Sequence, residues 1–285
     1  MRPAPFQYQE AGTVDEACAA LAARPGQVAI LAGGQSLVPE LNSRRRTPAM
    51  VLGIGRIAEL TTVTVEGDRL RIGATVIQRA LQRSGAARAV PVLLEALDHV
   101  GHVPTRNRGT VGGSIAFADP TAELPVVLLA LGGTVRARSA RGTRTVPAVD
   151  LFAGPFRTVL HPDELLIAVD IPLPAAGSRW AFEQRDFRRH AKVSVVAGSD
   201  PGGGLVVAVS GVGDRPLVLP DSASAYQRGG CAAVATAAAD LVTPIADRYG
   251  SVDYRRRLTR LAVTAAVERV SGDPTTTIPT REDAA

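Results

Sequence analysis

Two short glycine-rich segments contain the residues best suited to bind an anion. In each, a hydrophobic residue precedes a Gly-Gly pair, and short polar side chains follow it. Glycine lets a ligand approach the backbone closely, and successive N–H groups in such a turn form a concave anion site. The pair therefore predicts two backbone clamps on one ligand, which a pyrophosphate would fit. The candidate binding residues are Leu31, Ala32, Gly33, Gly34, Gln35, Ser36, Leu37, Val38, Thr110, Val111, Gly112, Gly113 and Ser114.

These segments differ from the usual nucleotide-binding signatures. Neither contains the phosphate loop Gly-x-x-x-x-Gly-Lys-Ser/Thr or the fingerprint Gly-x-Gly-x-x-Gly. Lys192, the only lysine of the chain, lies far from both in sequence. A single Gly-Gly pair is most often a tight bend, so the interpretation depends on the matching polar tails of the two segments.

The elements around the first segment predict a compact β-α-β-like unit. Thr13 and Glu16 have the spacing of a capping box, which predicts a helix over residues 13–23. The apolar run 27–31 predicts a buried strand that enters the first glycine turn, and residues 50–54 predict another. Ser36 is expected to N-cap a short helix.

The second segment lies among alternating strands and helices. Asp119 as N-cap and Pro120 as first residue predict the start of an apolar helix that continues to about Leu131. Gly67-Asp68 predicts a hairpin turn. The other predicted elements are strands at 61–65, 69–72, 134–138, 143–146 and 165–171, and helices at 76–84 and 90–98.

The residues after 178 predict a further unit of sheet and helices behind a linker at 172–178. Residues 193–198 are apolar, and their pattern fits either a strand or a helix. The tail from Ser271 is rich in Thr, Pro and charge and is expected to be mobile. The predicted elements are strands at 179–187 and 205–211 and helices at 231–241 and 253–270.

Composition excludes several classes of function for this chain of 285 residues. No apolar run reaches 18 residues, which predicts no membrane span, and the first residues do not resemble a signal peptide, so we expect a cytoplasmic protein. Cys18 and Cys231 are too few and too far apart for an iron–sulfur cluster or a cysteine zinc site.

The net charge of +5 comes from scattered arginines, and only 4% of the residues are aromatic. Little is available to stack on bases, so we expect no nucleic-acid partner. A basic surface suits an anionic cofactor or an acidic partner subunit instead.

No constellation of residues predicts acid–base, nucleophilic or metal catalysis. His99 and His102 lack a third ligand at helical spacing, so no metal site is expected. Ser36 and Ser114 have no adjacent His/Asp pattern, which argues against a hydrolase. The catalytic residues therefore stay unknown at this level.

The second glycine segment belongs to a longer pattern. Residues 105–114 read Thr-Arg-Asn-Arg-Gly-Thr-Val-Gly-Gly-Ser, and residues 119–125 read Asp-Pro-Thr-Ala-Glu-Leu-Pro. Together with residues 31–38, they resemble the FAD motifs of the flavoprotein medium subunit of molybdenum hydroxylases, the carbon monoxide dehydrogenase and xanthine dehydrogenase family. The resemblance extends from Phe6 to about Pro172 and continues more weakly afterwards.

The resemblance implies an α+β fold. A two-part FAD-binding domain of the PCMH type, with two α/β subdomains, would precede a C-terminal domain of sheet and helices. We expect the subdomains to span residues 1–55 and 56–175, and the C-terminal domain residues 176–285.

The resemblance also implies roles for the candidate residues. Residues 31–38 and 110–114 would contact the FAD diphosphate and its neighbouring ribityl and ribose groups. Glu123 would lie near the adenosine half, Asp119 would support the same loop, and Leu166 would pack near the isoalloxazine.

The function implied is that of an FAD-dependent oxidoreductase subunit. Electrons would arrive from a 2Fe-2S small subunit that serves a molybdopterin large subunit. They would leave to NAD, oxygen, a quinone or another small-molecule acceptor. The cofactor would perform the redox chemistry, and the protein would hold and tune it.

One segment departs from the family pattern and leaves alternatives open. Some relatives carry a lysine near the flavin in the strand after the linker, but residues 180–185 contain none, and residues 188–192 look shortened and altered. A self-contained flavin oxidoreductase that acts directly on a small-molecule substrate is therefore an alternative. A non-redox binding protein that kept the fold is another, and the intact glycines argue against it.

Overall fold

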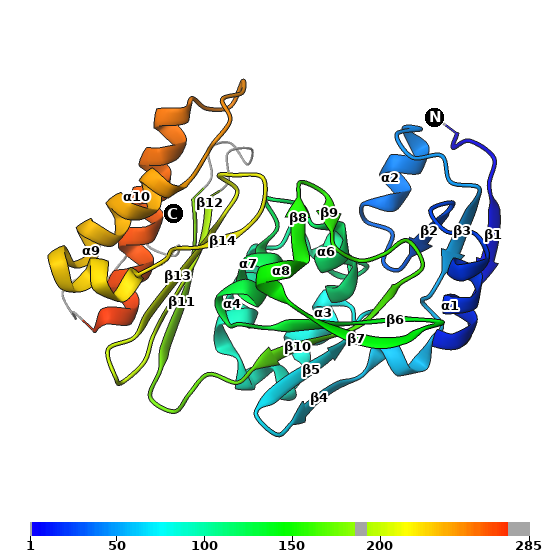
Figure 1. Cartoon of the computed structure of the whole chain (residues 1–285), viewed down its shortest axis with the longest axis horizontal. Coiled ribbons are helices and arrows are strands. Elements are labelled where there is room, and N and C mark those ends of the chain that lie inside the picture. Colours follow the sequence, from blue (N-terminus) through cyan, green and yellow to red (C-terminus); the bar gives the residue numbers. More distant parts are fainter. Residues whose placement is uncertain (1, 186–192, 273–285) are drawn as a thin grey trace.

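The computed structural model describes residues 2–185 and 193–272, and within them it forms three sheets and a two-stranded hairpin (Figure 1). The three sheets follow one another along the longest axis, in the order of the sequence. Figure 1 shows α4 and α7 between the second and third sheets, and α9 and α10 outside the third. The α+β fold expected from the sequence is confirmed.

The first unit is a three-stranded parallel sheet in the order β1-β3-β2. Its helix begins as predicted, because Thr13 Oγ1 accepts a hydrogen bond from Glu16 N at 3.1 Å. The sequence reasoning missed β1, which is polar and largely exposed at the sheet edge. The elements are β1 Gln7–Glu10, α1 Val14–Ala23, β2 Val28–Leu31, α2 Leu37–Asn42 and β3 Met50–Gly53.

The second unit is an antiparallel sheet in the order β4-β5-β10-β6-β7. Side chains alternate along its strands, so that Ile72 and Val135 are buried while Arg71 and Arg136 lie on the other face. A bulge between Leu166 and Ala168 interrupts the pairing of β10 with β6. The strands are β4 Val63–Glu66, β5 Arg69–Gly73, β6 Thr134–Ser139, β7 Gly142–Pro147 and β10 Leu165–Pro172.

Short helices and a hairpin cover the inner face of this second sheet. One of them, α7, is buried along its whole length because it contacts β12 and β13 of the third sheet as well. The elements are η1 Ala58–Thr61, α3 Gln78–Arg83, η2 Ala86–Ala89, α4 Pro91–His99, α5 Val103–Arg106, α6 Val111–Phe117, α7 Glu123–Ala130, α8 Ala148–Leu151, β8 Phe152–Gly154 and β9 Arg157–Thr158.

The predicted helix start at Asp119 and Pro120 is wrong. The Asp119 carboxylate accepts hydrogen bonds from the N–H and hydroxyl of Thr121, both at 2.8 Å, and so closes a turn instead of capping a helix. Ala122 is extended, and the helix starts at Glu123.

The third unit is the sheet β11-β12-β13-β14 with two long helices on its outer face. Residues 193–199 form a strand, which resolves the undecided segment. Helix α9 is kinked at Gly229 and Gly230. It begins at Ser222, before the predicted start at residue 231, and α10 begins at Val252, next to the predicted start at residue 253. The predicted tail beyond residue 272 and the altered residues 188–192 lie outside the described residues. The elements are β11 Arg179–Arg185, β12 Val193–Ser199, β13 Leu205–Ser210, β14 Leu217–Val218, α9 Ser222–Leu241 and α10 Val252–Ser271.

A cluster of polar contacts joins the third unit to the second. Arg269 on α10 donates to the Phe182 carbonyl at 2.8 Å and to the Glu95 carboxylate of α4 at 2.6 Å. Glu95 in turn accepts from Phe182 N at 3.1 Å. Within residues 2–185 and 193–272, no helix is long and apolar enough to cross a membrane.

Candidate functional site

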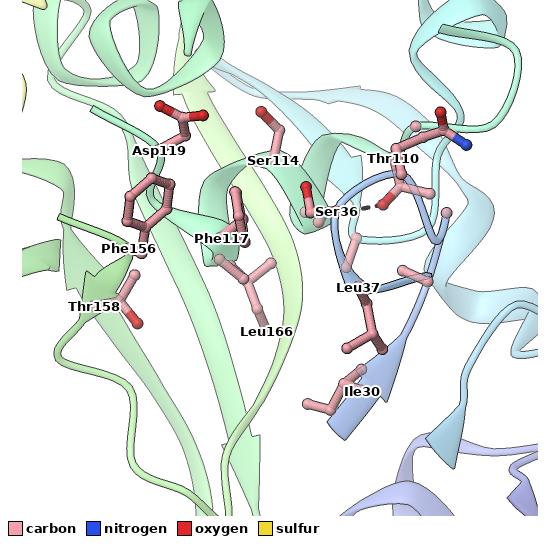
Figure 2. Close-up of a pocket in the computed structure, with 18 of the residues that line it drawn as sticks. Ile30, Ser36, Leu37, Thr110, Ser114, Phe117, Asp119, Phe156, Thr158 and Leu166 are labelled. Carbon is pink, nitrogen blue, oxygen red and sulfur yellow. Dashed lines mark hydrogen bonds between the residues drawn. The ribbon is translucent and has the colours of Figure 1, made fainter. Parts of the chain in front are cut away.

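A cavity of about 800 Å³ lies between the first unit and the inner face of the second sheet. Figure 2 shows side chains from the first glycine turn on one side of it and from α6, β9 and β10 on the other. Its volume falls within the range of ligand pockets in proteins. Of the residues predicted from the sequence, the wall contains Ala32, Gly33, Gly34, Gln35, Ser36, Leu37, Thr110, Gly112, Gly113, Ser114, Asp119, Glu123 and Leu166.

Three other predicted residues lie beside the wall of this cavity. Leu31 packs against the small apolar cluster under α2, and Val111 is buried in the main core. Val38 is exposed. Their part in cofactor binding stays a prediction.

The first glycine turn follows directly from β2 and presents a row of open amides. Gly34 has φ of +76°, the conformation that bends successive N–H groups toward one side. Within the described residues, the amides of Gly34, Gln35 and Ser36 donate no backbone hydrogen bond. Ser36 is the N-cap residue of α2, as predicted, but its hydroxyl makes no capping hydrogen bond, and Figure 2 shows it at the cavity. These groups are available to an anionic ligand.

The second glycine segment is built differently, because it forms the first turn of α6. Its amides are already used: Gly112 N donates to Ala74 O at 3.0 Å, and Gly113 N donates to Thr110 Oγ1 at 3.1 Å. Ser114 N donates to Thr110 O. The expectation of a backbone clamp therefore does not hold for the amides of Gly112, Gly113 and Ser114, since these are bonded within the protein.

The glycines of the second segment serve close packing and ligand approach. A Cβ on Gly112 would lie 2.6 Å from Ala74 Cβ, so this position packs helix α6 against the strand end. A Cβ on Gly113 would meet only Thr110 Oγ1 closely, with the next atom 3.9 Å away. Gly113 therefore offers the cavity a flat backbone surface.

The two glycine segments also touch each other. A Cβ on Gly33 would lie 2.1 Å from the Arg108 carbonyl oxygen and 3.0 Å from Gly109 Cα. Only glycine permits this approach. The relative position of the two turns is thus fixed by direct backbone contact.

An aromatic pair lies on the side of the cavity away from the glycine turns (Figure 2). The rings of Phe117 and Phe156 are 5.1 Å apart and tilted by 57°. Phe156 and Ala118 both have positive φ, near 55° and 52°, and Phe156 N donates to Ala118 O. Non-glycine residues adopt this conformation at a cost, and such residues concentrate at functional sites. Sequence reasoning missed the pair because no spacing connects residues 117 and 156.

Charge around the cavity is mixed. Arg45 and Arg46 line it, and so does Glu40. Glu164 also lines it, but its carboxylate accepts hydrogen bonds from Arg144 Nε at 2.6 Å and from His161 N at 2.7 Å. The Arg144 guanidinium holds the pKa of Glu164 below its ordinary value. Glu164 is therefore neutralised within the protein, and the two arginines remain for a ligand.

Glu123 connects the cavity wall to the third sheet. It is almost fully buried and accepts a hydrogen bond from Gln184 Nε2 at 3.0 Å. Gln184 lies on β11 and also bonds Ser194 Oγ at 3.0 Å. Gln184 belongs to residues 180–192, the segment that differs from the family pattern, and its side chain contacts this residue of the cavity wall.

These features fit FAD. The cavity of about 800 Å³ combines open amides and arginines for a diphosphate with a flat glycine surface and an aromatic pair. The fit rests on the donors of the first turn, since a buried anion needs such partners.

Comparisons with known proteins agree with this geometry. Residues 4–174 match the family described as the FAD binding domain in molybdopterin dehydrogenase. The chain is 34% identical to the nicotine 6-hydroxylase medium subunit of Paenarthrobacter nicotinovorans, over 89% of this chain and 93% of that one. It is 31% identical to the carbon monoxide dehydrogenase medium chain of Hydrogenophaga pseudoflava, over 90% of this chain and 93% of that one.

Solved structures show the same likeness. The structure of carbon monoxide dehydrogenase from Hydrogenophaga pseudoflava matches with a TM-score of 0.90 at 30% identity, over 95% of this chain and 99% of that one. Quinoline 2-oxidoreductase from Pseudomonas putida 86 matches with a TM-score of 0.86 at 30% identity, over 95% and 98%. The chain therefore belongs to the family of FAD-binding domains of molybdopterin dehydrogenases, and its cofactor is FAD.

Proposed function

We propose that the chain is the FAD-carrying subunit of a molybdenum hydroxylase-type dehydrogenase. It would pass electrons from an iron–sulfur and molybdopterin partner through FAD to a small-molecule acceptor. One observation carries the proposal: both glycine segments lie on one cavity of about 800 Å³, and the amides of Gly34, Gln35 and Ser36 are open there. FAD would supply the redox chemistry when bound.

The chain's own residues would bind and orient that cofactor. The open amides of the first turn would hold the diphosphate, with Arg45 and Arg46 balancing its charge. Gly113 would let the ligand chain pass against the backbone, and Leu166 would pack near the isoalloxazine. The roles of the amides, the arginines and Gly113 are supported by their chemistry, and that of Leu166 is what the family resemblance implies.

Glu123 and Asp119 would serve the adenosine half. The Gln184 amide and the Thr121 groups hold the two carboxylates in place. A carboxylate so oriented can accept hydrogen bonds from ribose hydroxyls. Leu31, Val38 and Val111 would support the two turns from behind.

The partners in this proposal are a molybdopterin large subunit and a 2Fe-2S small subunit. Its support is the naming of relatives as a medium subunit or medium chain of their enzymes. The proposed units are residues 1–55, 56–175 and 176–285. We also place the protein in the cytoplasm, where cysteine thiols such as those of Cys18 and Cys231, which form no disulfide within the described residues, stay reduced.

A visible spectrum tests the cofactor part of the proposal. The purified protein should absorb near ~450 nm or gain that absorbance on reconstitution, since the flavin is the chromophore. A protein that stays colourless after incubation with FAD would refute it.

A tagged chain expressed in its native host tests the subunit part. It should copurify with a molybdenum-containing and an iron–sulfur-containing polypeptide. Reduction of the flavin by a small-molecule substrate in the isolated chain would instead favour a self-contained flavin oxidoreductase.

A further inference from the structure

Gln78, the first residue of α3, is a buried polar side chain whose oxygen is unsatisfied. The residue is only 4% exposed. Within the described part of the chain, its Oε1 is sealed from solvent and has no hydrogen-bond partner. A buried acceptor in this condition destabilises the protein, so its presence calls for a function.

The backbone fixes Gln78 against the second glycine segment. Gln78 N donates to Gly109 O at 2.9 Å, and Val111 N donates to Val76 O at 2.9 Å. A bridge between Ile77 and Thr110 lies between these two bonds. The start of α3 is therefore held directly beside residues 109–111, and Gln78 lines the same cavity as they do.

The glycine at position 109 makes room for this side chain. A Cβ there would lie 2.8 Å from Gln78 Oε1 and 3.0 Å from the Thr105 carbonyl. That carbonyl already accepts the N–H groups of Arg108 and Gly109. The protein thus accommodates a carboxamide at this place without giving its oxygen a donor.

A carboxamide is suited to a hydroxyl-bearing ligand. A half-turn about its last torsion exchanges an acceptor oxygen for a donor NH₂ group, so either can be turned to the cavity. The sugar-like chains next to a diphosphate carry hydroxyl groups, which donate and accept. A ligand hydroxyl would supply the hydrogen-bond partner that the Gln78 oxygen lacks among the described residues.

We propose that Gln78 is an additional FAD-binding residue, whose carboxamide turns to the cavity and hydrogen-bonds a hydroxyl of the cofactor beside its diphosphate. The proposal rests on the FAD function argued above. The unsatisfied carboxamide would then lower the stability of the apoprotein and strengthen the binding of FAD.

The test compares Gln78→Met with the wild-type protein, and Gln82→Met serves as control. Gln82 lies on the same helix but bonds Asp98, away from the cavity. We expect apoprotein of Gln78→Met to melt at or above the wild-type temperature, because an unsatisfied buried acceptor is removed. Its dissociation constant for FAD, measured by quenching of flavin fluorescence, should rise about fivefold to tenfold. The control should keep the wild-type affinity.

A merely structural role predicts the opposite pattern. Lower melting of the apoprotein with unchanged FAD affinity would overturn the proposal. Gln78→Leu is the second variant, and failure of both variants to fold would also overturn it, because a destabilising group is not required for folding. If the wild-type protein itself binds no FAD, the proposed function fails, and this outcome is distinct from a loss confined to the Gln78 variants.

Discussion

Gly33→Ala tests the contact that sets the two glycine segments against each other. The new Cβ would lie 2.1 Å from the Arg108 carbonyl oxygen, whereas ordinary contacts begin at 3.4 Å. The turns would have to separate by about 1.3 Å, because both atoms belong to backbone and neither can rotate away. Overpacking of this kind costs about 1–3 kcal/mol, and the melting temperature should fall by about 2–4 °C per kcal/mol.

Cofactor affinity should fall in the same variant. A shift of about 1.3 Å moves the amides of Gly34, Gln35 and Ser36 out of hydrogen-bond reach of a diphosphate held by the rest of the cavity. Loss of one hydrogen bond to a charged group is worth about 1.5–3 kcal/mol, which corresponds to at least a tenfold rise in the dissociation constant.

The assay is a thermal melt of the apoprotein combined with an FAD titration followed by flavin fluorescence. Gly55→Ala is the matched control, because no atom lies within 4 Å of its Cβ position. Wild-type melting and wild-type affinity in Gly33→Ala would refute the argument that contact between the turns positions the amides.

Three further predictions concern other parts of the molecule. Gly113→Val should abolish FAD binding because it adds a branched side chain at the cavity wall, and it should also lower the melting temperature of the apoprotein, because its Cβ would lie 2.6 Å from the Thr110 Oγ1 that caps α6; a flavin-free spectrum of a folded variant checks the loss of binding. Arg144→Gln should lower stability near neutral pH. Arg144 lowers the pKa of Glu164, so the loss of unfolding free energy in the variant should be complete above about pH 4.5, the ordinary pKa of a glutamate. The loss should shrink as the pH falls below that value, and denaturant titrations at several pH values would show it. Arg269→Met removes hydrogen bonds between two units and should cost about 0.5–1.5 kcal/mol in calorimetry, because the Arg269 and Glu95 side chains are partly exposed to solvent, whereas Arg260→Ala, whose more exposed ion pair is 4.0 Å long, should change the melting temperature little.

Local sequence patterns predicted most of the regular elements correctly, and their failures share a cause. The Thr13 cap and the strands at 134–138 and 165–171 depend on neighbours in sequence, and the structure contains them. Asp119 failed as an N-cap although its carboxylate accepts the Thr121 N–H, because Ala122 is extended and the helix starts only at Glu123. The helix α6 was missed because a Gly-Gly pair is a poor helix former, and Thr110 caps it nonetheless.

The candidate site shows the same division between local and long-range information. The glycine segments were identifiable because they are contiguous runs. Arg45, Phe156 and Gln78 were not, since each enters the cavity from a separate stretch of chain whose own pattern predicts no ligand contact. Their role depends on which faces the sheets and turns bring together.

The sequence by itself predicted two glycine segments for one anionic cofactor, because the freedom of a glycine backbone is a local property. Only the tertiary structure decided that the amides of the two segments differ in their hydrogen bonding. In the second segment, Ala74 and Thr110 occupy the amides of Gly112 and Gly113, while the first leaves the amides of Gly34 to Ser36 open. Whether an amide is free depends on the acceptors that the folded chain brings to it, and those acceptors come from packing rather than from the motif.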